Sequence, residues 1–91
     1  QMLTEQARYR YHNAADILYR LSKSSRDSRQ YPDYLWQSAD AYRLAHDYHR
    51  TSRVMRMYLD ENQPQRRADA LLAIGEAELA LNNLEAALAP L

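Results

Sequence analysis

The stretch ADALLAIGEAELALNNLEAALAPL, residues 68–91, decides the fold. Its first part places Leu71, Ile74 and Gly75 on one face of an amphipathic helix, and the polar pair Asn82-Asn83 interrupts the pattern. The apolar spacing of three and four then resumes at Leu84, Ala87, Leu88 and Leu91. The stretch therefore predicts a helix, a two-residue turn and the start of a second helix. Because one hairpin cannot bury both its faces alone, we expect neighbours of the same kind.

The composition fits one small all-α domain. The chain has 91 residues, is rich in helix formers, contains one Gly and three Pro, and shows no alternating β-type runs. It has no Cys, so cytoplasm and bacterial periplasm or cell envelope both stay open as compartments. There is no signal-peptide pattern and no apolar run of membrane-spanning length. Because the sequence stops within an apolar pattern, we expect it to be part of a longer protein.

Charge is unevenly distributed although the formal net charge is zero. Ten of the twelve Lys and Arg lie in residues 1–58, whereas six of the twelve acidic residues lie in residues 59–91. The simplest interpretation is ordinary solvated helix faces. The alternative is a basic end that meets an acidic partner or the acidic end of a neighbouring repeat.

A leading helix is predicted over residues 5–23, with Thr4 as its N-cap. We expect one stripe of this helix to pack inward, formed by Ala7, Tyr11, Ala14, Leu18 and Leu21. A turn at Tyr9-Arg10, with residues 1–8 belonging to an earlier helix, stays open as an alternative. The polar segment Ser24 to Tyr31 predicts the longest loop.

Two similar units follow the leading helix, a first at residues 33–60 and a truncated second at residues 65–91. Pro32 favours the start of a helix over residues 33–45, and His46-Asp47 makes a turn before a return helix over residues 48–60. The inner faces of these two helices are predicted to contain Leu35, Trp36, Ala39, Ala41, Tyr42, Ala45, Tyr48, Thr51, Ser52, Met55, Tyr58 and Leu59. Pro64 separates this unit from a helix predicted from about Gln65 to Leu81.

The two units repeat with a period of about 36 residues. A shift of this length places Asp33 on Asp69, Trp36 on Leu72, and Ala39 on Gly75, and it also aligns Asp40 with Glu76, Tyr48 with Leu84 and Thr51 with Ala87. Small residues thus meet small ones and turn residues meet turn residues. A helix–turn–helix period of this length is the signature of an α-solenoid.

These residues resemble the tetratricopeptide repeat family. The second unit matches best, through Leu71, Ile74, Gly75, Leu84, Ala87 and Leu91. The resemblance implies an α-α superhelix of antiparallel helix hairpins whose first helices line a concave groove. The groove residues it implies are Asp33, Trp36, Asp40, Arg43, Asp69, Leu72, Glu76 and Leu79. Residues 31–64 also resemble the tetratricopeptide segments of bacterial cell-envelope assembly proteins.

The resemblance implies a protein-interaction scaffold that binds a partner protein or peptide in this groove. Chaperone-binding members of the family use Lys, Asn and Arg to hold a terminal carboxylate, but Trp36, Asp40, Leu72 and Glu76 stand at those positions here. An acidic C-terminal peptide is therefore a poor candidate. One alternative is a self-association or assembly module of a larger repeat protein. A further alternative is nucleic-acid binding through the half rich in Arg and Tyr, which the zero net charge disfavours.

No catalytic or metal-binding pattern is present in the sequence. It contains no nucleophile motif, phosphate loop or zinc-protease spacing, so we expect neither an enzyme nor a cofactor. His46, His49 and Asp47 supply too few converging ligands for a metal. Arg50, Arg53 and Arg56 are interpreted as a solvated convex face, with a basic patch for anionic lipid or an acidic partner as the alternative.

Two further expectations concern packing. Gly75 in mid-helix needs a reason, and we expect it where the two helices of the second unit approach most closely. The terminal helices leave apolar residues without a neighbour, namely Ile17, Tyr19, Leu84, Leu88 and Leu91. We therefore expect the isolated chain to hide these surfaces in a homodimer.

Overall fold

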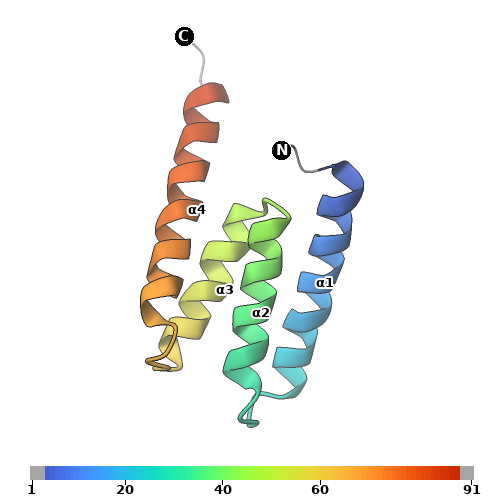
Figure 1. The fold of residues 1–91 in the computed structure, drawn as a ribbon, viewed down its shortest axis with the longest axis vertical. Coiled ribbons are helices and arrows are strands. Elements are labelled where there is room, and N and C mark those ends of the chain that lie inside the picture. Colours follow the sequence, from blue (N-terminus) through green and yellow to red (C-terminus); the bar gives the residue numbers. More distant parts are fainter. Residues whose placement is uncertain (1–3, 89–91) are drawn as a thin grey trace.

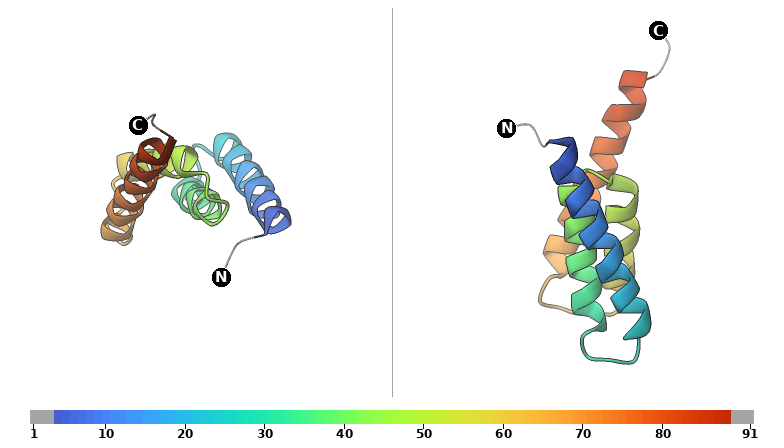
Figure 2. Two further views of the ribbon diagram at one scale, coloured as in Figure 1. Left: turned by 90° about the horizontal axis from the view of Figure 1, so that it is seen from above. Right: turned by 90° about the vertical axis from the view of Figure 1, so that its right-hand side faces the viewer.

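The computed structural model describes residues 4–88, and within this range the chain forms four α-helices and no strand. The helices are α1 (Glu5–Ser24), α2 (Tyr31–Leu44), α3 (Tyr48–Asp60) and α4 (Arg67–Leu88). Each helix packs mainly against the next one in the chain and runs in the opposite direction (Figure 1). Seen from above, the four helices form a row in which α1 and α4 lie at the two ends (Figure 2). The all-α prediction is confirmed.

The helix ends follow the capping signals in the sequence. Thr4 caps α1, because its Oγ1 accepts a hydrogen bond at 3.0 Å from the backbone N–H three residues later. Asp47 caps α3 in the same way at 3.2 Å, and Pro32 lies in the first turn of α2. The predicted turn is confirmed, with His46 in the left-handed region at φ 60°. Since α1 is continuous, the alternative turn at Tyr9-Arg10 is wrong.

The hydrophobic core is centred on α2 and α3. Most predicted inward positions of these helices are buried, including Leu35, Ala39, Tyr42, Thr51, Met55 and Tyr58, and Val54 is a core residue that the prediction omitted. Polar groups in the core have partners: the Ser38 hydroxyl donates to the Ala15 carbonyl at 2.8 Å. Within residues 4–88, every buried polar side-chain atom has a hydrogen-bond partner. The α2–α3 hairpin is thus the most completely packed part of the molecule.

The buried face of α1 differs from the predicted one. The helix packs through Ala15 and Ser22, which are fully buried, whereas Tyr11 is 38% and Leu21 is 41% exposed. Ala15 and Ser22 are small, so α2 can approach closely and the Ser38 hydroxyl can reach the α1 backbone. The prediction of an inward Tyr11–Leu21 stripe is therefore wrong by about one residue of helix rotation. Tyr19, which was expected to lack a neighbour, packs against the core beside Ala15 and Ser22.

The predicted turn at Asn82-Asn83 is also wrong, because α4 continues through both residues to Leu88. Asn lowers helix stability relative to Ala only by about 0.7 kcal/mol or less, and the neighbouring Ala, Leu and Glu residues are strong helix formers. The 22-residue α4 is nine residues longer than the 13-residue α3, or about 13 Å at 1.5 Å per residue. Its C-terminal part extends past the α2–α3 turn (Figure 1). The predicted Leu91 lies outside the described residues.

Gly75 does not mark a close helix contact. It is exposed, and a Cβ atom built on it would meet no atom within 4 Å. The reason is that α4 continues through Asn82-Asn83, so no return helix folds back over this face within residues 4–88. Leu71, one turn earlier on the same face, is accordingly 49% exposed.

Candidate functional site

A groove lies between α2 and α4 and brings together six of the eight predicted groove residues. Its volume is about 210 Å³. It is lined by Trp36, Asp40 and Arg43 from α2, by Asp69, Leu72 and Glu76 from α4, and by Met55 and Ala73. On each helix the predicted residues recur every three or four positions, so each helix presents one row toward the other. We call this cavity the α2/α4 groove.

Trp36 forms one wall of the α2/α4 groove and is only partly buried. Its ring packs against Tyr58, with the ring centroids 5.4 Å apart and the planes tilted by 59°. The Arg66 guanidinium carbon lies 5.2 Å from the centroid of the Trp36 ring, within the range of a cation–π contact. The indole is therefore held in place while part of its surface faces the groove.

The α2/α4 groove carries an excess of negative charge. Arg43 donates hydrogen bonds from Nε and Nη2 to the Asp40 carboxylate, at 2.9 and 2.7 Å, so these two charges compensate each other. Asp69 and Glu76 form no ion pair within residues 4–88. One cation and three carboxylates thus surround an apolar surface of Trp36, Leu72 and Met55 side chains.

Two predicted groove residues lie outside this cavity. Asp33 faces the loop before α4, where its carboxylate is 3.5 Å from the Arg66 guanidinium and both residues line a separate cavity of about 320 Å³. Leu79 lies farther along α4 and is 61% exposed. Asp33 and Leu79 thus lie one helical turn beyond the cavity, at opposite ends of the two predicted rows.

The predicted basic face of α3 is largely neutralised. Arg50 forms an ion pair with the Asp47 carboxylate at 2.8 Å, and Arg56 forms one with Glu78 of α4. Only Arg53 of the three has no ion pair within the described part of the chain. All three side chains are exposed as predicted, but their charges do not form one free patch.

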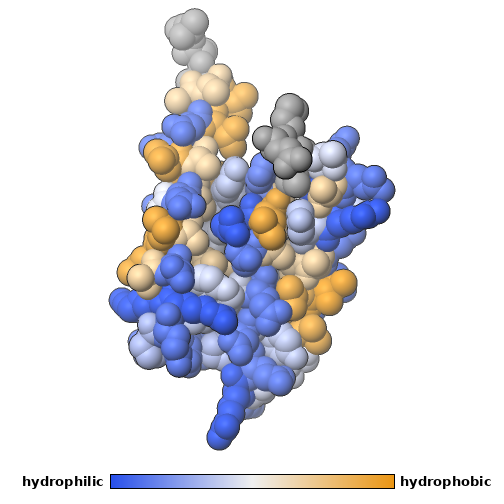
Figure 3. Space-filling model, in the orientation of Figure 1, coloured by the Kyte–Doolittle hydropathy of each residue, from blue (hydrophilic) through white to orange (hydrophobic). Residues whose placement is uncertain are grey.

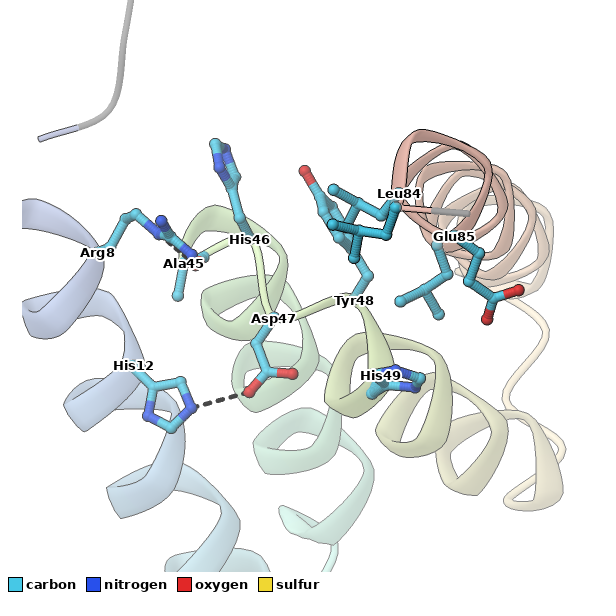
Figure 4. Close-up of a pocket in the computed structure, with 11 residues that line it drawn as sticks. Arg8, His12, Ala45, His46, Asp47, Tyr48, His49, Leu84 and Glu85 are labelled. Atoms are coloured by element: carbon cyan, nitrogen blue, oxygen red, sulfur yellow. Dashed lines mark hydrogen bonds and ion pairs between the residues drawn. The ribbon is translucent and has the colours of Figure 1, made fainter. Parts of the chain in front are cut away.

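A polar cluster that the sequence reasoning missed joins α1 to the α2–α3 turn. His12 Nε2 lies 2.8 Å from the Asp47 carboxylate (Figure 4). On the other side of the ring, His12 Nδ1 lies 3.5 Å from Asp16. The Tyr42 hydroxyl donates to Asp16. Burial and this hydrogen bond raise the pKa of Tyr42 well above its usual value of 10.0. Burial alone would raise the pKa of Asp47, but hydrogen bonds from Arg50 and His12 lower it.

This cluster links α1 to α2 and to the α2–α3 turn. Its side chains bond to one another, and within residues 4–88 no group of three or more His, Asp or Glu side chains is arranged to hold a metal ion. The prediction missed the cluster because it placed Tyr11, and not His12, on the inward face of α1. No helix in the described range is long and apolar enough to cross a membrane.

Comparison with protein-family models, curated proteins and solved structures finds no match to this chain. The tetratricopeptide resemblance therefore stays a prediction that rests on the residues themselves.

Proposed function

We propose that this chain is a non-catalytic protein-interaction scaffold of the tetratricopeptide type, which binds a segment of a partner protein in the α2/α4 groove. The observation that carries the proposal is the convergence of two rows from different helices on one cavity. Trp36, Asp40 and Arg43 face Asp69, Leu72 and Glu76, although 26 or more residues separate the two rows in the sequence. Antiparallel helices that pack in chain order support the same assignment.

The chemistry of the α2/α4 groove selects the partner. Trp36 and Leu72 offer apolar surface, and Leu72 is 61% exposed. The carboxylates of Asp69 and Glu76 are not compensated by an ion pair within the described residues. A segment that places a large apolar side chain beside Lys or Arg would satisfy both features, whereas an acidic segment would be repelled.

Peptide titration tests this proposal directly. Trp36 is the only tryptophan in the chain, so its fluorescence reports on the groove without labelling. We would compare two 15-residue peptides that contain no Trp and carry Leu at the same positions. The remaining positions are Lys in one peptide and Glu in the other. We expect saturable binding of the Lys peptide and none of the Glu peptide.

A matched pair of charge reversals locates the binding. Glu76→Lys should weaken binding of the Lys peptide by about tenfold, since it replaces an attraction with a repulsion. Glu61→Lys makes the same change at an exposed position outside the groove and should have little effect. Equal losses in the two variants, or binding of both peptides alike, would refute recognition by the groove.

A further inference from the structure

The apolar stripe that packs α4 onto α3 continues past the N-terminal end of α3. Its positions alternate in steps of four and three: Ala70, Ile74, Ala77, Leu81, Leu84 and Leu88. The first three are at most 7% exposed, whereas Leu84 is 51% and Leu88 is 83% exposed. This alternation is the spacing of a helix–helix seam. The second half of the seam has no covering helix among the described residues.

A notch flanks this uncovered half of the stripe. We call it the apex notch: a cavity of about 430 Å³ between the projecting end of α4 and the N-terminal part of α1, with the α2–α3 turn as its floor. Leu84 extends from α4 toward Tyr48, and Arg8 and His46 lie on the opposite side (Figure 4). Apolar surface gathers along the projecting part of α4 in the space-filling view (Figure 3).

Charge around the apex notch specifies what fits it. The charged side chains that line it are Arg8 on the α1 side, Asp47 on the floor and Glu85 on α4. Asp47 is already paired with Arg50 and His12, whereas Arg8 and Glu85 form no ion pair within residues 4–88. Residues 76–88 of α4 contain three Glu and no Lys or Arg, and a helix C-terminus carries partial negative charge. Arg8 and Glu85 are thus charges of opposite sign on the two sides of the notch, so a second copy of the chain can offer its Glu85 to Arg8 and its Arg8 to Glu85.

The exposed area is large enough for an interface. The chain exposes 6691 Å², about 1,200 Å² more than the roughly 5,500 Å² expected for a compact protein of 10.7 kDa. A standard protein interface covers about 800 Å² on each partner. If one copy buried about 800 Å² in an interface, it would still expose at least as much surface as a compact monomer of the same mass.

We propose that the apex notch is a self-association site, which receives residues 81–88 of α4 from a second copy. A two-fold axis near Leu84 would place the two α4 stripes antiparallel against each other. Glu85 of each copy would then lie near Arg8 of the other copy, so the same contact is made twice. This site is separate from the α2/α4 groove, with which it shares no lining residue.

Solution mass measurements on the 91-residue chain test the proposal. Light scattering and sedimentation equilibrium up to about 100 μM should show a monomer–dimer equilibrium. Leu84→Glu should weaken the dimer about 100-fold or more, because the substitution enters the symmetric contact twice. Leu79→Glu is the matched control, since Leu79 is 61% exposed on another face of α4. It should dimerise like the unmodified chain.

A cysteine test fixes the contact even where Leu84→Glu alters helicity. The chain contains no Cys, so Leu84→Cys provides a single thiol, which should form a disulfide-linked dimer on mild oxidation because its symmetry mate lies close by. Leu79→Cys should stay monomeric under the same conditions. A strict monomer at 100 μM, a dimer that Leu84→Glu leaves intact, or equal loss in the Leu79→Glu control would each overturn the proposal.

Discussion

Substituting Gly75 distinguishes the observed single helix α4 from the hairpin that the sequence predicts. Gly75 is exposed in mid-helix, and an added Cβ meets no atom within 4 Å. The substitution Gly75→Ala therefore changes only helix propensity and the entropy of the unfolded chain, which together favour Ala by about 1 kcal/mol. For a domain of this size, that gain corresponds to a rise in melting temperature of about 4–8 °C.

Gly75→Leu sharpens the same test. In the structure the larger side chain points into open space, so its effect should be close to that of Ala, since Leu is also a strong helix former. In a hairpin with a helix crossing at Gly75, Leu would overpack and cost about 1–3 kcal/mol. Urea unfolding followed by circular dichroism measures both variants. A loss of stability in Gly75→Leu would refute the open α4 and restore the hairpin.

Three further outcomes follow from the packing and the pKa shifts. Met55→Ala truncates a side chain that is 1% exposed and leaves a cavity in the core. The free energy of unfolding, measured in urea, should fall by about 2–5 kcal/mol. Asn82→Ala and Asn83→Ala should each raise the helix content measured by circular dichroism, because each stabilises α4 by up to about 0.7 kcal/mol. A reduced helix content would indicate a turn at these residues. Burial and the bond to Asp16 raise the pKa of Tyr42 from 10.0, so its contribution to stability is complete below pH 10 and declines as the pH rises further. Urea unfolding across this range should show that decline, and Tyr42→Phe should reduce it.

Helix positions were predictable wherever the sequence contains an explicit start or stop signal. Thr4, Pro32 and Asp47 each define a helix start by their own chemistry, and the structure has helices that begin there. Asn82-Asn83 is a weaker signal, because Asn disfavours a helix only slightly and nothing there forces a turn. Whether a turn forms there depends on how much apolar surface a return helix would bury against α4. The local sequence pattern does not contain this information.

Predicting the faces was harder than predicting the helices. The α2 and α4 rows follow from the tetratricopeptide resemblance, which assigns the groove to the first helix of each unit, and six of these eight residues line one cavity. On α1, the apolar residues were assigned inward, yet Ala15, Ser22 and His12 make the contacts with the hairpin. Their contribution comes from close backbone approach and from partners more than 20 residues away. Periodicity of hydrophobic residues does not register either effect.

The chain-order packing of the four helices also bears on how the molecule unfolds. Each helix contacts mainly its sequence neighbours, so most contacts are local and folding should be fast for a chain of this length. Since α1 and α4 sit at opposite ends of the row, neither depends directly on the other for its packing. Either end helix can detach while the α2–α3 hairpin persists, as in a one-dimensional array with nearest-neighbour coupling. Loss of structure should therefore proceed from the ends inward, and native-state hydrogen exchange should protect the amides of α2 and α3 longest.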